Sequence, residues 1–151
     1  MSKSNQLVMG CDDAALQFKN DLMKFLKTKG YEIEDVGIFS PDDATLYPHV
    51  AEKACKIIAD SGFQKRGILV CGTGIGMAMS ANKCPGIRAA QVHDAFSAER
   101  AALSNDAHVI TMGARIIGIE LAKKLVMEWL PLEFVPGPSS PKVAAIMDLG
   151  K

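Results

Sequence analysis

The residues of this chain best suited to chemistry form the stretch Cys71-Gly72-Thr73-Gly74-Ile75-Gly76. A short aliphatic run, 68–70, precedes it, and a segment of helical composition, 75–82, follows. A strand, a glycine-rich turn and a helix N-terminus together predict a site where backbone N–H groups bind an anion. A thiolate beside such donors could take a proton from a carbon next to a carbonyl, while the amides hold the enediolate oxygen that forms. The alternative is that Cys71 is a buried structural cysteine at the end of a strand.

Two other phosphate-binding motifs do not fit this stretch. The dinucleotide fingerprint Gly-x-Gly-x-x-Gly, counted from Gly72, needs a glycine where Met77 stands. A P-loop needs Gly-Lys-Ser/Thr where the chain has Met77-Ala78-Met79. The glycine loop therefore predicts an anion site of a different kind.

The composition predicts a single domain over residues 1–151, because 151 residues with 48% hydrophobic content can bury one sizeable core. The 17 basic and 17 acidic residues balance, so bulk charge favours neither a nucleic-acid nor a membrane partner. The four cysteines show neither Cys-x-x-Cys nor zinc spacing, which predicts reduced thiols in the cytoplasm and no metal. We expect no signal peptide and no membrane span.

Strands and helices alternate along the chain. Expected strands lie at 6–10, 32–36, 68–70, 87–92 and 107–112, and expected helices at 14–29, 48–61, 75–82, 95–104 and 116–130. Such alternation with short connections predicts an α/β fold, a three-layer α/β/α sandwich around a five-stranded parallel sheet. The expected strand order is the Rossmann-like 2-1-3-4-5.

The C-terminal segment 131–151 is expected to form an arm. Four prolines between 131 and 141 interrupt regular structure, and 142–149 could form a short helix with apolar Val143, Ile146 and Leu149. These side chains need a surface to cover them. We expect that surface to belong to a second subunit, and the alternative is the arm's own domain.

The expected sheet also gathers polar residues, because ligands bind outside the carboxyl ends of parallel strands. The segments that follow those ends contain Asp12, Asp13, the loop 71–76, His93, Asp94 and the turn 113–115. These residues form the candidate site.

Several motifs together resemble ribose-5-phosphate isomerase type B and its galactose-6-phosphate isomerase relatives. They are Cys71–Gly76, Ser80-Ala81-Asn82-Lys83, Pro85-Gly86-Ile87-Arg88-Ala89-Ala90, Asn105-Asp106 and Gly113-Ala114-Arg115. The resemblance runs from Gly10 to about Ile146. It implies a homodimer, with a tetramer as a further option, whose subunits share the site. It also implies aldose–ketose isomerisation of a small phosphorylated sugar through an enediol, without metal or cofactor.

The same resemblance implies roles for individual residues. Cys71 is the base that moves a proton between adjacent carbons. The enediolate oxygen is held by Thr73 and by the amides of Gly72, Gly74, Ile75 and Gly76. Asp12 contacts sugar hydroxyls, and Asn105 contacts the substrate from the partner subunit. Arg115 helps to bind the phosphate, with a surface ion pair as the alternative for this side chain.

Four positions depart from the ribose-type pattern. Asp13 stands where those enzymes commonly carry a histidine, and Ser104 stands where they carry the acid that opens the sugar ring. Two arginines that usually bind phosphate are replaced by Pro138 and Lys142, so Lys142 is the remaining cation there. His93 is a candidate acid from another direction, and its alternative is a solvated loop histidine.

The missing acid favours a four-carbon substrate. A pentose 5-phosphate closes into a furanose through its C4 hydroxyl, but in a tetrose 4-phosphate that oxygen carries the phosphate. Residues 97–105 and 110–115 are also similar to the erythrulose-4-phosphate isomerase branch of the family. D-erythrulose 4-phosphate is therefore the favoured substrate and D-ribulose 5-phosphate the alternative. Two readings from other classes are a non-catalytic sugar-phosphate-binding protein and a thiol redox protein, the latter without a resolving cysteine near Cys71.

Overall fold

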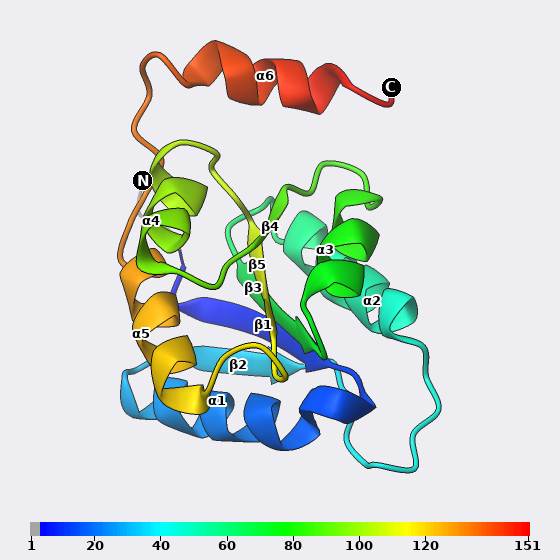
Figure 1. Ribbon diagram of the computed structural model, residues 1–151. Coiled ribbons are helices and arrows are strands. Elements are labelled where there is room, and N and C mark those ends of the chain that lie inside the picture. The colour runs from blue at the N-terminus through cyan, green and yellow to red at the C-terminus, as the bar shows by residue number, and fades with distance from the viewer. Residues whose placement is uncertain (1–3) are drawn as a thin grey trace.

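A parallel sheet of five strands forms the centre of the computed structural model, which describes residues 4–151 (Figure 1). The strands are β1 (Gln6–Cys11), β2 (Glu32–Asp35), β3 (Arg66–Cys71), β4 (Ala89–Gln91) and β5 (Val109–Gly113). Every pairing is parallel, so all carboxyl ends lie at one edge of the sheet. The predicted α/β sandwich is confirmed.

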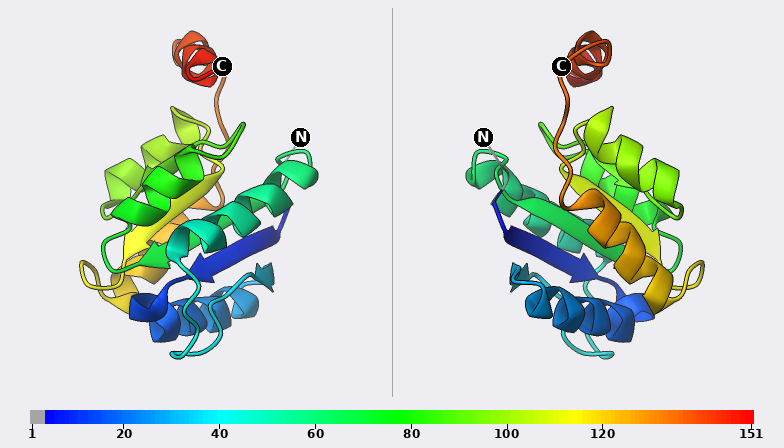
Figure 2. Two further views of the ribbon diagram at one scale, coloured as in Figure 1. Left: turned by 90° about the vertical axis from the view of Figure 1, so that its right-hand side faces the viewer. Right: turned by 90° about the vertical axis from the view of Figure 1, so that its left-hand side faces the viewer.

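Helices cover both faces of the sheet (Figure 2). They are the 3₁₀ helix η1 (Asp13–Ala15), α1 (Leu16–Thr28), α2 (Tyr47–Asp60), α3 (Ile75–Asn82), α4 (Ala95–Leu103), α5 (Ile119–Trp129) and α6 (Ser140–Asp148). On one face α5 packs against both α1 and α4, and on the other α2 packs against α3. Helix α5 begins three residues later than predicted, because the turn 114–117 hydrogen-bonds back to β3, β5 and the glycine loop.

The predicted strand order 2-1-3-4-5 is wrong, because the observed order is β2-β1-β3-β5-β4. Strand β5 is buried along its whole length and pairs with β3 on one side and β4 on the other. Strand β4 is only three residues long and partly exposed, which suits an edge but not an interior position. The site prediction survives this correction, since the order of parallel strands does not change which edge their carboxyl ends share.

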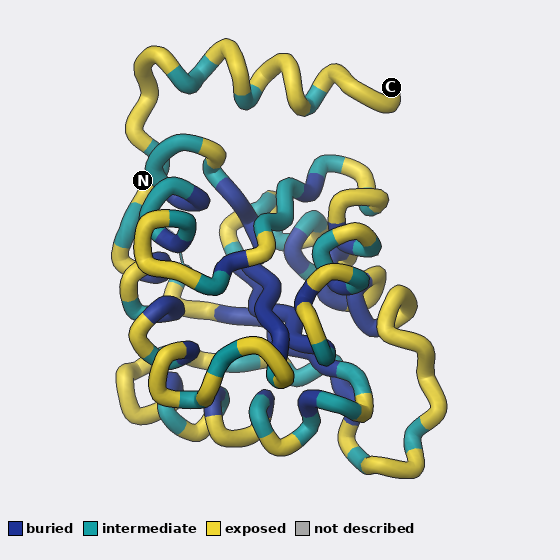
Figure 3. The backbone as a smooth tube through the Cα atoms, viewed as in Figure 1, coloured by how far each residue is buried: buried dark blue, intermediate teal, exposed yellow. Residues whose placement is uncertain are grey.

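The core lies where β1, β3 and β5 meet the helices, and Figure 3 shows this central band as the most buried part of the chain. All six residues of β3 are buried, as expected of a strand covered on both faces. Cys71 is the last of them. The residue singled out for chemistry therefore ends the strand at the centre of the sheet, where it has little freedom to move.

Helix α6 stands away from the sandwich, as Figure 1 shows. It begins two residues before the predicted start and contains no buried residue. Leu149 is 78% exposed and Ile146 is 43% exposed. The predicted C-terminal helix is confirmed, and its packing on a second subunit stays a prediction.

A buried lysine of α1 holds the segment that follows β2, and the backbone of that segment pairs with the end of β1. The ammonium of Lys19 is fully buried and lies 2.7 Å from both the Asp35 carboxylate and the carbonyl oxygen of Ile38. Cys11, the last residue of β1, exchanges backbone hydrogen bonds with the same segment, donating to Gly37 at 2.7 Å and accepting from Ile38 at 3.0 Å. The lysine therefore helps to fix the backbone from which Asp12 projects.

We expect Lys19→Met to lower the free energy of unfolding by roughly 3 kcal/mol, because it leaves the Asp35 carboxylate without its buried partner. The double variant Lys19→Met/Asp35→Asn should lose clearly less than the sum of the two single losses. Urea denaturation of the four proteins measures the cycle. Additive losses, or a Lys19→Met variant as stable as the parent, would contradict this account of the pair.

Candidate active site

The thiol of Cys71 lies at the carboxyl end of β3, where its residue is only 5% exposed. The backbone N–H of Gly74 donates to its sulfur at 3.1 Å. Gly74 adopts φ +79°, a conformation that L side chains rarely tolerate, and this turn aims the amide back at the sulfur. The buried sulfur therefore accepts a backbone hydrogen bond immediately before the start of α3.

Three further hydrogen bonds hold the glycine loop rigid. The hydroxyl of Thr73 accepts from the N–H of Ile75 at 3.2 Å, which keeps the hydroxyl proton available to a ligand. The side-chain amide of Gln91 donates to the Thr73 carbonyl at 2.7 Å, and the Thr111 hydroxyl donates to the Gly74 carbonyl at 2.8 Å. The carbonyls of the loop are thus bonded to protein, while the first N–H groups of α3 have no acceptor within the helix.

Asp12 lies beside this loop and its carboxylate is half-buried. Its N–H donates to the Val70 carbonyl at 3.2 Å, and its carboxylate accepts from the N–H of Ala14 at 3.0 Å. Burial raises the pKa of Asp12, an effect that the Ala14 hydrogen bond and the more distant charge of Arg115 oppose. Asp13 is exposed and begins the 3₁₀ helix that follows. Of the two carboxylates, only Asp12 is held in place at the site.

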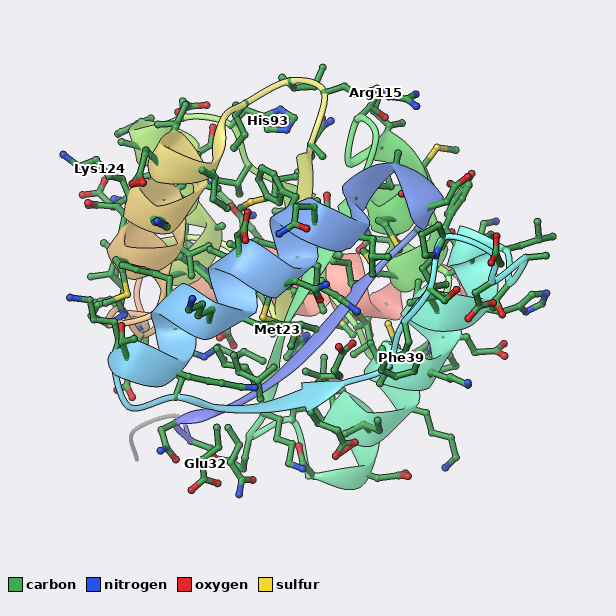
Figure 4. All side chains as sticks on the ribbon, turned by 90° about the horizontal axis from the view of Figure 1, so that it is seen from below. Met23, Glu32, Phe39, His93, Arg115 and Lys124 are labelled. Atoms are coloured by element: carbon green, nitrogen blue, oxygen red, sulfur yellow. The ribbon has the colours of Figure 1, made fainter. Side chains whose placement is uncertain are left out.

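Arg115 folds back over the loop from the turn after β5. Its N–H donates to the Gly72 carbonyl at 3.0 Å, and its side chain passes so close that a Cβ on Gly72 would lie 3.4 Å from Nη1. Within residues 4–151 the guanidinium forms no ion pair, which disfavours the alternative of a surface salt bridge. Figure 4 shows Arg115 and His93 at the same end of the molecule, near the loop that follows β5.

His93 supports the site through the backbone. Its Nε2 accepts the N–H of Gly113 at 2.9 Å, so the imidazole is neutral and carries its proton on Nδ1. Burial lowers the pKa of His93, and only the neighbouring Asp94 opposes this shift. A neutral ring with one nitrogen already engaged is better suited to holding the turn at Gly113 than to donating a proton from Nε2.

Ser104, Asn105 and Lys142 lie away from the Cys71 of their own subunit. Gly113 is the register partner of Cys71, whereas Asn105 precedes the opposite end of β5, several residues away at about 3.3 Å per residue. The Asn105 carbonyl accepts from Arg88 at 3.1 Å, and the Ser104 hydroxyl accepts from Arg100 at 2.7 Å. Lys142 belongs to α6, beyond the same end. One subunit therefore does not bring these three residues to its own thiol.

The sequence prediction missed three residues at the loop: Gln91, Thr111 and Tyr47. Thr111 gave a usable signal, because it is the one polar residue in an otherwise apolar buried strand. The ring of Tyr47 packs against Gly76, leaving no room there for a side chain. The local sequence around Tyr47 and Gln91 gives no sign of their contacts with the loop, because only the tertiary fold brings these residues to it.

The described residues give no sign of a metal centre or a membrane span. Within residues 4–151 no group of three His, Cys, Asp or Glu side chains is arranged to hold a metal ion. No helix in the same range is long and apolar enough to cross a bilayer. All four cysteines are free thiols.

The fold and the site define an α/β-sandwich protein with a buried thiol beside a glycine-rich loop and a helix N-terminus. Comparison with known proteins is more specific. The family model described as Ribose/Galactose Isomerase matches residues 7–146. The chain belongs to this family, and it is a sugar-phosphate isomerase.

Individual relatives agree with the family. Ribose-5-P isomerase B of Listeria innocua is 49% identical over 138 residues, covering 91% of this chain and 92% of its own. D-erythrulose-4-phosphate isomerase of Pectobacterium atrosepticum is 48% identical over 140 residues, with coverages of 93% and 91%. The solved structure of Clostridium thermocellum ribose-5-phosphate isomerase B superposes with a TM-score of 0.90 at 34% identity, and 95% of each chain is covered. These relatives are therefore named for two different substrates.

The closest backbone approach in the site makes a steric prediction. A Cβ on Gly113 would lie 2.6 Å from the Cα of Thr73 and 2.8 Å from the Gly72 carbonyl oxygen. We expect Gly113→Ala to push the loop away from β5, to cost roughly 1–3 kcal/mol of stability and to lower activity. Gly118→Ala is the matched control, since a Cβ there meets nothing within 4 Å. Thermal unfolding and a kcat measurement on both variants test this. Equal behaviour of the two variants would contradict the steric account.

Proposed function

We propose that this enzyme interconverts a ketose phosphate and an aldose phosphate through an enediolate, with the Cys71 thiolate as the base. The observation that carries the proposal is the hydrogen bond from the Gly74 N–H to the Cys71 sulfur, because Gly74 is the N-cap of α3. The thiolate removes a proton from carbon 1 of the ketose and, as a thiol, returns it to carbon 2. Between these steps the negative charge lies on the enediolate oxygen, and the hydroxyl proton passes from the oxygen of carbon 1 to the oxygen of carbon 2, so that carbon 1 becomes the aldehyde.

The surrounding groups divide the remaining work. The hydroxyl of Thr73 and the amides of Gly72, Gly74, Ile75 and Gly76 hold the enediolate oxygen, where preorganised donors are most effective. Asp12, which the 3₁₀ helix orients, accepts hydrogen bonds from sugar hydroxyls. Arg115 lies over the loop with no competing carboxylate in ion-pair contact, so its guanidinium is available for the phosphate.

The proposed substrate is D-erythrulose 4-phosphate, and the alternative is D-ribulose 5-phosphate. Identities of 48% and 49% to relatives named for each sugar do not discriminate between them. The groups available for ring opening favour the four-carbon sugar. The Ser104 hydroxyl is bound by Arg100 and is a poor acid, and the Nε2 of His93 is occupied by the Gly113 N–H. The aldose of the pentose pair, D-ribose 5-phosphate, closes into a furanose that must be opened, whereas neither tetrose 4-phosphate can form this ring or needs such an acid.

The proposed assembly is a homodimer in which each subunit completes the other's site. Asn105 and Lys142 are remote from their own Cys71, and α6 leaves its apolar side chains uncovered. Helix α3, which starts at the glycine loop, exposes Ile75 by 52% and Met79 by 67% on one face. An apolar face beside an incomplete site is what an isologous partner would cover.

We expect Cys71→Ala to fold normally and to lower kcat on the order of 10²–10⁴-fold, the usual contribution of a general base. Cys84→Ala is the matched control, because its thiol donates to the Ser80 carbonyl at the far end of α3. Proton NMR in D₂O follows deuterium uptake at carbon 1 and the appearance of aldose. Normal turnover by Cys71→Ala would refute the base assignment, and binding without exchange by the parent protein would favour a non-catalytic sugar-phosphate-binding protein.

The same NMR measurement decides the substrate. D-erythrose 4-phosphate and D-ribose 5-phosphate are supplied separately at equal concentration, because of these two aldoses only the pentose closes into a furanose. Turnover of the tetrose well above that of the pentose is the expected result. Equal or faster turnover of the pentose would contradict the four-carbon assignment while leaving the enediolate chemistry intact.

Mixing two inactive variants tests the shared site. We expect both Cys71→Ala and Asn105→Ala to be nearly inactive alone. After unfolding and refolding together in equal amounts, half of the dimers contain one of each, and each such dimer has one intact site. About a quarter of the parent activity should therefore return. No recovery, with dimers present in size-exclusion chromatography, would contradict a site made from Cys71 of one subunit and Asn105 of the other.

A further inference from the structure

A cavity of about 300 Å³ lies at the end of the sheet opposite Cys71. It sits at the amino ends of β1, β2 and β3, where the chain also leaves α5. Arg66, Lys29, Tyr31 and Glu133 contribute polar side chains to its wall. None of these residues belongs to the site of the isomerisation.

Arg66 is an unusual residue for this position. It is the first residue of β3, only 5% exposed, and its guanidinium lies 5.1 Å from the centroid of the Trp129 ring. Its Nε is buried without a hydrogen-bond partner, and within residues 4–151 no carboxylate forms an ion pair with it. Buried charges in proteins are generally paired. Burial lowers the pKa of Arg66, and Tyr31 and Glu133 oppose this only from a distance.

A second donor beside Arg66 also lacks an acceptor. The indole Nε1 of the fully buried Trp129 has no hydrogen-bond partner. Across the described residues, these two nitrogens are the buried side-chain polar atoms without a partner. Most buried donors in proteins are satisfied, so the unpaired Nε of Arg66 and the unpaired Nε1 of the neighbouring Trp129 mark a region that is short of acceptors.

The charges around the cavity favour an anion. Lys29 is exposed next to Arg66, and Glu133 is the acidic residue of the wall, so two cations face one carboxylate. A guanidinium offers a planar fork of donors that matches the oxygens of a phosphate or a carboxylate. We propose that this cavity is a second anion site, which binds a small oxyanion through Arg66 with Lys29 at its rim.

This site is separate from the catalytic loop. Arg66 and Cys71 are the two ends of the six-residue strand β3, and at about 3.3 Å per residue they are well over a dozen ångströms apart. An oxyanion bound at Arg66 should therefore not compete with a sugar phosphate bound beside Cys71. The proposal does not depend on which sugar the enzyme isomerises.

Trp129 offers a direct probe, because it is the single tryptophan of the chain and lies against Arg66. The full-length protein is titrated with inorganic phosphate and, separately, with acetate, while sodium chloride keeps the ionic strength constant. Tryptophan fluorescence and the indole N–H resonance in a ¹⁵N-correlated NMR spectrum follow binding. We expect a saturable change with at least one of the two anions, and their comparison separates a phosphate from a carboxylate ligand.

Three variants locate the response. Arg66→Met, an apolar side chain of similar length, should abolish it. Arg115→Gln, at the catalytic loop, should leave it unchanged. Lys29→Gln changes an exposed side chain that does not threaten folding, and it should weaken the apparent affinity a few-fold. A response that does not saturate with either anion, that persists in Arg66→Met, or that disappears in Arg115→Gln would overturn the proposal. Should Arg66→Met fail to fold, an unchanged affinity in Lys29→Gln would overturn it as well.

Discussion

The site depends on one close approach between two backbones. The turn after β5 meets the loop after β3 at Gly113, where there is no room for a side chain between Thr73 and the Gly72 carbonyl. Because the two segments touch, the Thr111 hydroxyl reaches the Gly74 carbonyl and the Arg115 N–H reaches the Gly72 carbonyl. The glycine loop is therefore part of the sheet edge rather than a free surface loop, and contacts within the fold fix the direction of its amides.

This arrangement also defines the surroundings of the thiol that we propose as the base. Cys71 is buried at the end of the central strand, and its sulfur accepts the N–H of Gly74 directly before the N-terminus of α3. Asp12 and His93 flank the loop, and neither adds a positive charge there. Asp12 is a carboxylate, and the ring of His93 is neutral. Arg115 is the cation that lies over the loop.

Central strand β3 carries a functional group at each end. At its carboxyl end the Gly74 N–H donates to the buried thiol of Cys71. At its amino end the Arg66 guanidinium is buried against Trp129, and its Nε has no hydrogen-bond partner. The two ends of one rigid strand therefore place different donors, backbone amides at one and a guanidinium at the other.

The sequence by itself determined the elements and the identity of the loop. Gly72, Gly74 and Gly76 at alternate positions after an aliphatic run define a strand, a turn and a helix start through local geometry, and each was found where predicted. The gathering of Asp12, the loop and Arg115 at one edge followed from parallel pairing alone. The tertiary structure decided what depends on contacts between distant segments. These include the position of β5 between β3 and β4 and the ion pair between Lys19 and Asp35. They also include the hydrogen bonds from Gln91 and Thr111 to the glycine loop, and the separation of Asn105 from the Cys71 thiol of its own subunit. Periodicity records which face of an element is buried, but it carries no information about which neighbour buries it.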